Sequence, residues 1–126
     1  MEPTITLVHQ DVRGEIYSIT LPDNRELMLL HSKAGTFRGG HSHDCDEIVV
    51  LVSGKMRYHK KRHEVDVVRE LHSGDSSFNR AGEVHMGECL TDCWITEMKY
   101  AEKDSWTQTD YEPYRARVRE SARTQS

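Results

Sequence analysis

Three histidines and one glutamate have residue types and spacing that could bind a metal ion. His41 and His43 are separated by one residue, and Glu47 follows four residues later. Alternate residues of a β-strand face the same side, so these three side chains are expected on one face. His85 lies in a second, turn-rich segment that begins at Gly74. Imidazole nitrogens with one carboxylate oxygen suit Fe, Mn, Ni, Co or Zn better than Ca or Mg, and they leave coordination positions for water or a substrate.

The residues after Glu47 form an apolar run. Ile-Val-Val-Leu-Val at residues 48–52 predicts a buried strand. A carboxylate that enters such a strand is costly to bury unless it meets a cation. The alternative is an exposed histidine-rich turn with a solvated glutamate. The offset of Glu47 from the histidines, and the glycines at positions 35 and 54 that frame the segment, favour the metal site.

These two segments resemble the sequence motifs of the cupin superfamily. The first motif, Gly-x5-His-x-His-x3,4-Glu-x6-Gly, is matched without a gap from Gly35 to Gly54. The second, Gly-x5-Pro-x-Gly-x2-His-x3-Asn, is matched at both glycines and at the histidine. It differs at two turn positions, where Arg80 replaces the proline and Cys89 replaces the asparagine. The resemblance covers residues 35–89, which is less than half of the chain.

The resemblance implies a fold and a ligand set. Members of the superfamily are all-β proteins that fold as a small antiparallel β-barrel, a jelly roll, and commonly form homodimers. The four metal ligands would be His41, His43, Glu47 and His85. Cupins with three histidines and one glutamate often use Fe(II) or Mn(II). A metal-dependent enzyme acting on a small oxygenated substrate is therefore implied, with a dioxygenase ahead of an isomerase or lyase. A non-catalytic small-molecule-binding or sensor module remains the alternative.

The pattern along the chain is one of short strands separated by turn signals. Strands are expected at residues 5–8, 15–21, 27–31, 36–43, 48–52, 55–59, 65–71, around 78, 84–89 and 93–101. This succession is typical of a sandwich or barrel and not of a βαβ fold. The barrel would occupy residues 1–103 as a single domain.

Residues 104–126 differ from the rest and form a C-terminal tail. Pro113 could open a short helix that continues to Ala122. The simplest interpretation is a surface-packed helix. Because disordered tails are usually poor in aromatic residues, Trp106, Tyr111 and Tyr114 also allow an arm that contacts a partner subunit or closes over the barrel mouth.

A metal-dependent reaction usually needs a general acid or base near the metal. The catalytic candidates are Glu47 itself and, on the last long strand, Glu97 and Tyr100. Strand alternation places Trp94, Thr96, Met98 and Tyr100 on one side and Cys93, Ile95, Glu97 and Lys99 on the other. The pattern does not decide which set faces the interior, and the simplest interpretation gives Glu97 and Lys99 a solvated face. Further candidates are Lys99, Tyr58 and Arg38.

Composition limits the classes of function. A chain of 126 residues with a net charge of −4 at pH 7 has one modest core and gives no case for binding nucleic acid or membranes. The basic run at residues 55–63 is expected to be a solvated hairpin tip. No stretch approaches the roughly 18 apolar residues of a membrane span, and a signal-peptide pattern is absent, so a cytoplasmic location is expected.

The cysteine count also bears on location. Cys45, Cys89 and Cys93 are an odd number, which argues against a secreted disulfide framework. Cys45 lies between two expected ligands and shares their parity, so it could approach the metal.

Overall fold

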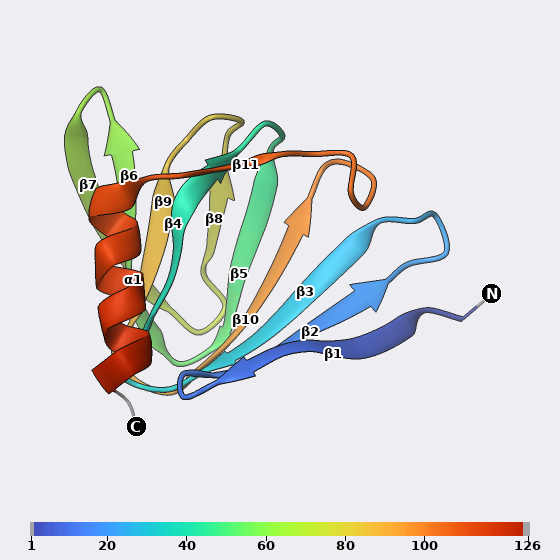
Figure 1. Cartoon of the computed structure of the whole chain (residues 1–126), viewed down its shortest axis with the longest axis horizontal. Helices are drawn as coiled ribbons and strands as arrows, with labels where there is room; N and C mark the ends of the chain where they lie inside the picture. Colours follow the sequence, from blue (N-terminus) through green and yellow to red (C-terminus); the bar gives the residue numbers. More distant parts are fainter. Residues whose placement is uncertain (1, 125–126) are drawn as a thin grey trace.

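The computed structural model describes residues 2–124, which form two antiparallel sheets and one C-terminal helix (Figure 1). In spatial order, the six-stranded sheet contains β1 (Thr4–Asp11), β2 (Gly14–Thr20), β3 (Glu26–Ser32), β10 (Cys93–Lys99), β5 (Glu47–Ser53) and β8 (Ser76–Asn79). The five-stranded sheet contains β11 (Gln108–Asp110), β4 (Phe37–His43), β9 (His85–Cys89), β6 (Lys55–Arg62) and β7 (Val65–His72). Helix α1 spans Glu112–Thr124.

The predicted all-β jelly-roll architecture is confirmed, with one difference in its closure. Each strand expected from the sequence is present, within a few residues of its expected bounds. The two sheets do not close into a continuous barrel, and they diverge on the side of β1 (Figure 1). Strand β1 pairs only with β2 among the described strands, and its side chains are almost all exposed, so it lies outside the packed interior.

The core lies between the two sheets. On β5 the alternate residues Glu47, Val49 and Leu51 are buried, as the period of a strand requires. Val49 and Leu51 pack with Met56 from the other sheet and with Ile95 of β10. The inward set on β10 is therefore the one that contains Glu97 and Lys99, and the expectation of a solvated face for these two residues is wrong. The burial of Ile95 decides the orientation of β10, because alternate residues of a strand share a face and Glu97 and Lys99 therefore face the same side as Ile95.

Helix α1 packs against β4 over a second, smaller apolar cluster. Tyr114 and Val118 of the helix are buried on Met86 of β9. Close approach requires a glycine in β4: a Cβ at Gly40 would lie 3.0 Å from the Cδ and 3.1 Å from the backbone nitrogen of Arg115. Gly40 also has a φ of 86°, a conformation that disfavours other residues. Among the described residues, no helix has the length and apolar character that crossing a bilayer requires.

The tail is built into the sheet as well as onto it. Strand β11 pairs with β4, so that Gln108 lies opposite His43 and Asp110 opposite His41. The connection from β10 to β11 passes across the ends of the strands near β4 and β5 (Figure 1). Of the arrangements expected for the tail, the structure has the helix packed on the surface and the preceding segment lying over one end of the sheets.

Candidate metal centre

Two neighbouring strands bring the three histidines together. His41 and His43 lie on β4, and His41 is paired in register with His85 on β9. The ring centroids are 4.7 Å apart for His41 and His43, 5.2 Å for His41 and His85, and 5.3 Å for His43 and His85. Within residues 2–124 these three residues form the group whose donor atoms all lie within 4.8 Å of one another. Three imidazoles therefore converge on one point.

A bulge in β4 sets the direction of His41. The β4–β9 register shifts between Gly39 and His41. Gly39 has a φ of 92°, and a Cβ there would lie 3.1 Å from the carbonyl oxygen of His85, so a side chain would obstruct the pairing. In a regular strand, Arg38 and His41 would face opposite sides because their positions differ by three, an odd number. The extra residue changes this alternation, and both side chains line one cavity.

Glu47, the first residue of β5, completes the cluster from the other sheet. Its Oε1 lies 3.2 Å from His85 Nε2, and its Oε2 lies 3.5 Å from His43 Nε2 and 3.2 Å from Lys99 Nζ. Burial alone would raise the pKa of this carboxyl. The hydrogen bond with His85 and the positive charge of Lys99 outweigh burial and hold the pKa below its usual range. The side chain is thus an anion inside the protein.

The protonation of the cluster fits a metal cation. His85 Nδ1 lies 3.1 Å from the carbonyl oxygen of Glu83 and donates to it, so that Nε2 faces a Glu47 oxygen. This contact between a ring nitrogen and a carboxylate oxygen requires a proton or a metal between the two atoms. Burial lowers the pKa of His41 to about 3 and that of His43 to about 4, so these imidazoles are neutral at pH 7. Neutral imidazoles beside a carboxylate are the donor set of a divalent transition metal.

Three polar residues hold Glu47 in place. Asn79 lies opposite Glu47 in the β5–β8 pair, and its Nδ2 donates to Glu47 Oε1 at 3.1 Å and to Tyr58 Oη at 2.8 Å. Ser77 Oγ donates to Asn79 Oδ1 at 3.0 Å. Such partners fix the orientation of a ligating carboxylate. Sequence reasoning missed Asn79 and Ser77, although their alternation on a short strand opposite Glu47 is the signal that could have indicated them.

A lysine and a tryptophan cover the other side of the cluster. Lys99 Nζ lies 4.2 Å from the centre of the Trp106 ring, and that ring packs edge-on against His43 at 5.2 Å. Trp106 belongs to the segment that passes over the ends of the strands, so this segment shields the cluster from water. Cys45 lies in the bend between β4 and β5 and is partly buried, which raises the pKa of its thiol. It is outside the group of converging donors.

The two catalytic candidates on β10 lie in different places. Glu97 faces the interior and lines a cavity of about 170 Å³ together with His41 and Arg38. Burial and the nearby Glu47 carboxylate raise the pKa of Glu97 to about 7. Tyr100 follows the end of β10 and is 49% exposed, with its ring against Phe78. The structure therefore brings Glu97, and not Tyr100, to the side of the histidines.

Comparison with known proteins gives structural relatives only. No family model and no curated protein sequence matches the chain significantly. CapF, solved with 3-isopropenyl-tropolone, superposes with a TM-score of 0.66 at 24% identity over 81% of this chain. Oxalate decarboxylase from Bacillus subtilis gives 0.71 at 18% identity over 80%, and that from Lactobacillus farciminis gives 0.68 at 21% over 79%. The chain spans 32%, 28% and 31% of these three proteins, respectively.

These neighbours are cupin-fold proteins, and they share with this chain the arrangement of two antiparallel sheets. At such identities the likeness concerns the fold, whereas the cupin motifs come from this chain's own residues. The motif histidines converge at one end of the sheets with the motif glutamate beside them. Sequence motif and structure agree, and the chain has the fold of the cupin superfamily.

Proposed function

We propose that the protein is a metal-dependent enzyme that acts on a small oxygenated organic substrate, and that its reaction is that of a dioxygenase. His41, His43, Glu47 and His85 would hold the metal. The observation that carries the proposal is that the donor cluster borders a cavity, because His41 belongs to the cluster and also lines the cavity. A purely structural metal site is normally closed by its protein ligands, whereas a catalytic one keeps an open position.

The metal would supply Lewis acidity or redox chemistry to a substrate beside it. The chain's own residues would do the rest. Asn79, which also donates to Tyr58, orients Glu47, and Trp106 keeps water from the His43 side. Glu97 lies on the cavity with a pKa of about 7, so this carboxyl can hold or release a proton near neutral pH.

The metal in this proposal is Fe(II) or Mn(II). Mn(II) centres are described for the Bacillus subtilis oxalate decarboxylase among the structural neighbours. That protein is 18% identical to this chain, so its metal guides the choice of ions to test and no more.

The test is elemental analysis of untagged protein purified without chelators, followed by oxygen-uptake assays with a panel of small oxygenated acids, alcohols and diketones. Stoichiometric Fe or Mn with metal-dependent oxygen uptake is expected. Bound metal with substrate turnover but no oxygen uptake would move the assignment to an isomerase or lyase. Failure to bind any of Fe, Mn, Ni, Co or Zn after reconstitution would contradict the enzyme and leave a small-molecule-binding module.

We also propose that the protein is a cytoplasmic homodimer. All three cysteines are free, which suits a reducing compartment. Apolar side chains are exposed on the edge strand β1, at Ile5, Leu7 and Val8, and on β10 of the same sheet at Trp94. An edge strand with such side chains is a site for pairing with a second chain. Light scattering on the purified protein is expected to give twice the mass of one chain, and a monomer mass would contradict this part of the proposal.

A further inference from the structure

Arg38 is a buried cation whose terminal nitrogens have no partner among the described residues. Its side chain comes from β4, and the residue is 6% exposed. Nε donates to Ser32 Oγ at 2.7 Å, but Nη1 and Nη2 make no hydrogen bond. Burial lowers the pKa of Arg38 to about 10, so the guanidinium remains charged at neutral pH. A buried guanidinium with two unpaired terminal nitrogens is strongly destabilising, so its presence indicates an anion that binds there.

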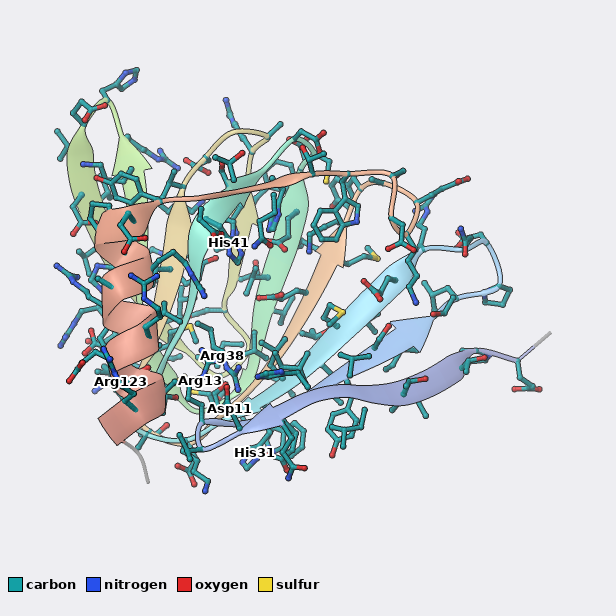
Figure 2. The ribbon with its side chains drawn as sticks, in the orientation of Figure 1. Asp11, Arg13, His31, Arg38, His41 and Arg123 are labelled. Carbon is teal, nitrogen blue, oxygen red and sulfur yellow. The ribbon has the colours of Figure 1, made fainter. Side chains whose placement is uncertain are left out.

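The position of Arg38 fits a ligand that also reaches the metal centre. Arg38 lies in the interior between the two sheets, beneath His41 in the view of Figure 2. Both residues line the 170 Å³ cavity. A cavity of about 150 Å³ accommodates a molecule as large as benzene. The space is therefore sufficient for a compact ligand of about six non-hydrogen atoms.

The charges around the cavity favour an anion. Arg13 is already neutralised, because its Nη2 lies 2.6 Å from Asp11 Oδ2. Arg115 reaches the cavity from α1 and donates from Nη1 to the carbonyl oxygen of Gly39 at 2.8 Å. Glu97 is the one carboxylate that lines the cavity, and no ion pair joins it to Arg38 within the described chain. Among the residues that the structure describes, Arg38 and Arg115 have no carboxylate in an ion pair, and one glutamate, Glu97, shares the cavity with them.

The rest of the wall is apolar. Ile16 and Met28 pack against the main core, and Leu30 belongs to it. These three side chains line the same cavity as Arg38. A guanidinium binds a carboxylate with two parallel hydrogen bonds, and the aliphatic wall suits a short hydrocarbon group. The cavity is therefore complementary to an aliphatic carboxylate and less so to inorganic anions, which lack the apolar part.

We propose that this cavity is a carboxylate subsite, in which Arg38 binds the carboxylate of a small aliphatic acid and Ile16, Met28 and Leu30 contact its hydrocarbon part. Arg115 adds positive charge from the helix. The claim that the other end of the ligand is the reacting end rests on the proposed function. Binding of the carboxylate by Arg38 does not depend on that function. The subsite and the proposed enzyme activity can therefore fail separately.

The test is calorimetric titration of the full chain, with its resident metal, with butyrate and with butyramide as the neutral analogue. Butyrate is expected to bind and butyramide to bind at least tenfold more weakly. Arg38→Met should weaken butyrate binding at least tenfold, because a charge-assisted bidentate contact is lost, and Arg38→Lys should give an intermediate affinity. Arg123→Met is the matched control: Arg123 is exposed on α1 and pairs with Glu120, and its loss should change nothing.

The same titration of His85→Ala separates the subsite from the metal. Arg38-dependent binding of butyrate in this variant would support the subsite even if the protein had no metal-dependent activity. Binding that is lost in His85→Ala but kept in Arg38→Met would place the carboxylate on the metal and overturn the subsite. Equal binding of butyrate and butyramide, or no butyrate binding to the unsubstituted protein, would overturn it as well. In these last two cases, water and the Glu97 carboxylate would be the hydrogen-bond partners of the Arg38 terminal nitrogens.

Discussion

Two buried clusters of histidine and carboxylate side chains lie on the five-stranded sheet and its neighbours, and only one of them has the character of a metal centre. In the first, the rings of His41, His43 and His85 converge beside Glu47. In the second, the single ring of His59 on β6 lies between two carboxylates, with Nδ1 3.6 Å from Asp66 and Nε2 3.6 Å from Glu88. Both clusters contain buried ring nitrogens without a hydrogen-bond partner.

The carboxylates explain the difference. Glu88 of the second cluster has an arginine at 3.1 Å, Arg57, and Asp66 accepts a hydrogen bond from Tyr114. Each carboxylate is thus already partnered, and only one imidazole is present. A buried histidine next to a carboxylate is therefore not sufficient to indicate a metal. Convergence of several neutral imidazoles on one point is the informative feature.

The largest expected difference between the clusters is in metal content. His85→Ala removes one of three converging nitrogens and is expected to abolish stoichiometric metal, as are His41→Ala and His43→Ala. His59→Ala removes an equally buried ring and should keep the full metal content. Elemental analysis after gel filtration, with circular dichroism to show that the sheets persist, makes the comparison. Metal retained in all three cluster variants would exclude the site, and metal lost in His59→Ala would remove the distinction.

A smaller effect is expected from the groups that orient Glu47. Asn79→Ala deletes the donor to Glu47 Oε1 and should weaken metal affinity about 10- to 100-fold, the usual effect of losing such a partner. Glu47→Gln keeps an oxygen but removes the charge, and it too should weaken binding without abolishing it. The matched change in the second cluster, Glu88→Gln, should leave affinity unchanged. Competition titrations with a chromophoric chelator measure all three variants, and an unaltered affinity in Glu47→Gln would mean that this carboxylate does not bind the metal.

The pH dependence of stability gives a third comparison. After removal of metal, His41 and His43 resist protonation in the folded protein, since burial lowers the pKa values to about 3 and about 4 from an ordinary 6.5. Below about pH 6.5 the unfolded chain binds protons on these rings and the folded chain does not. The free energy of unfolding therefore falls as the pH drops from 7 toward 4.

His43→Phe cannot be protonated at this position, so its stability should fall less over the same range. The expected difference between the two proteins is about 2–3 kcal/mol between pH 7 and pH 4. Urea unfolding of the chelator-treated proteins measures it. His72→Phe, a change at an exposed position, is the control and should follow the unsubstituted protein. Parallel curves for His43→Phe and the unsubstituted protein would show that His43 is not held neutral by burial.

The first cluster could be predicted from sequence because its spacing is local. His41, His43 and Glu47 lie within seven residues, and the glycines and the apolar run after Glu47 fix their context. The strands could also be predicted from the sequence, because turn residues separate them and polar and apolar residues alternate along them. The inward face of β10 could not be predicted, because polar and apolar residues occur on both sides of this strand. Only the packing of Ile95 against the core decides its orientation.

Contacts between segments that are distant in the chain also could not be predicted from the sequence. Asn79 meets Glu47 across 32 residues of chain, and a strand register that no local pattern specifies brings them together. The cavity beside His41 depends on the bulge at Gly39, which reverses the alternation that strand parity predicts for Arg38.

The smallest expected effect concerns what the second cluster does. Tyr114 of α1 donates from its hydroxyl to Asp66, and its ring lies 6.1 Å from that of His59, so this cluster joins the helix to the sheet. Tyr114→Phe removes one hydrogen bond to a carboxylate and should lower the free energy of unfolding by about 1–2 kcal/mol with no change in metal content. Tyr100→Phe, at an exposed ring, is the matched control and should be neutral. If Tyr114→Phe also lowers metal affinity, then helix docking and the metal centre are coupled through β4, and the two clusters are parts of one unit.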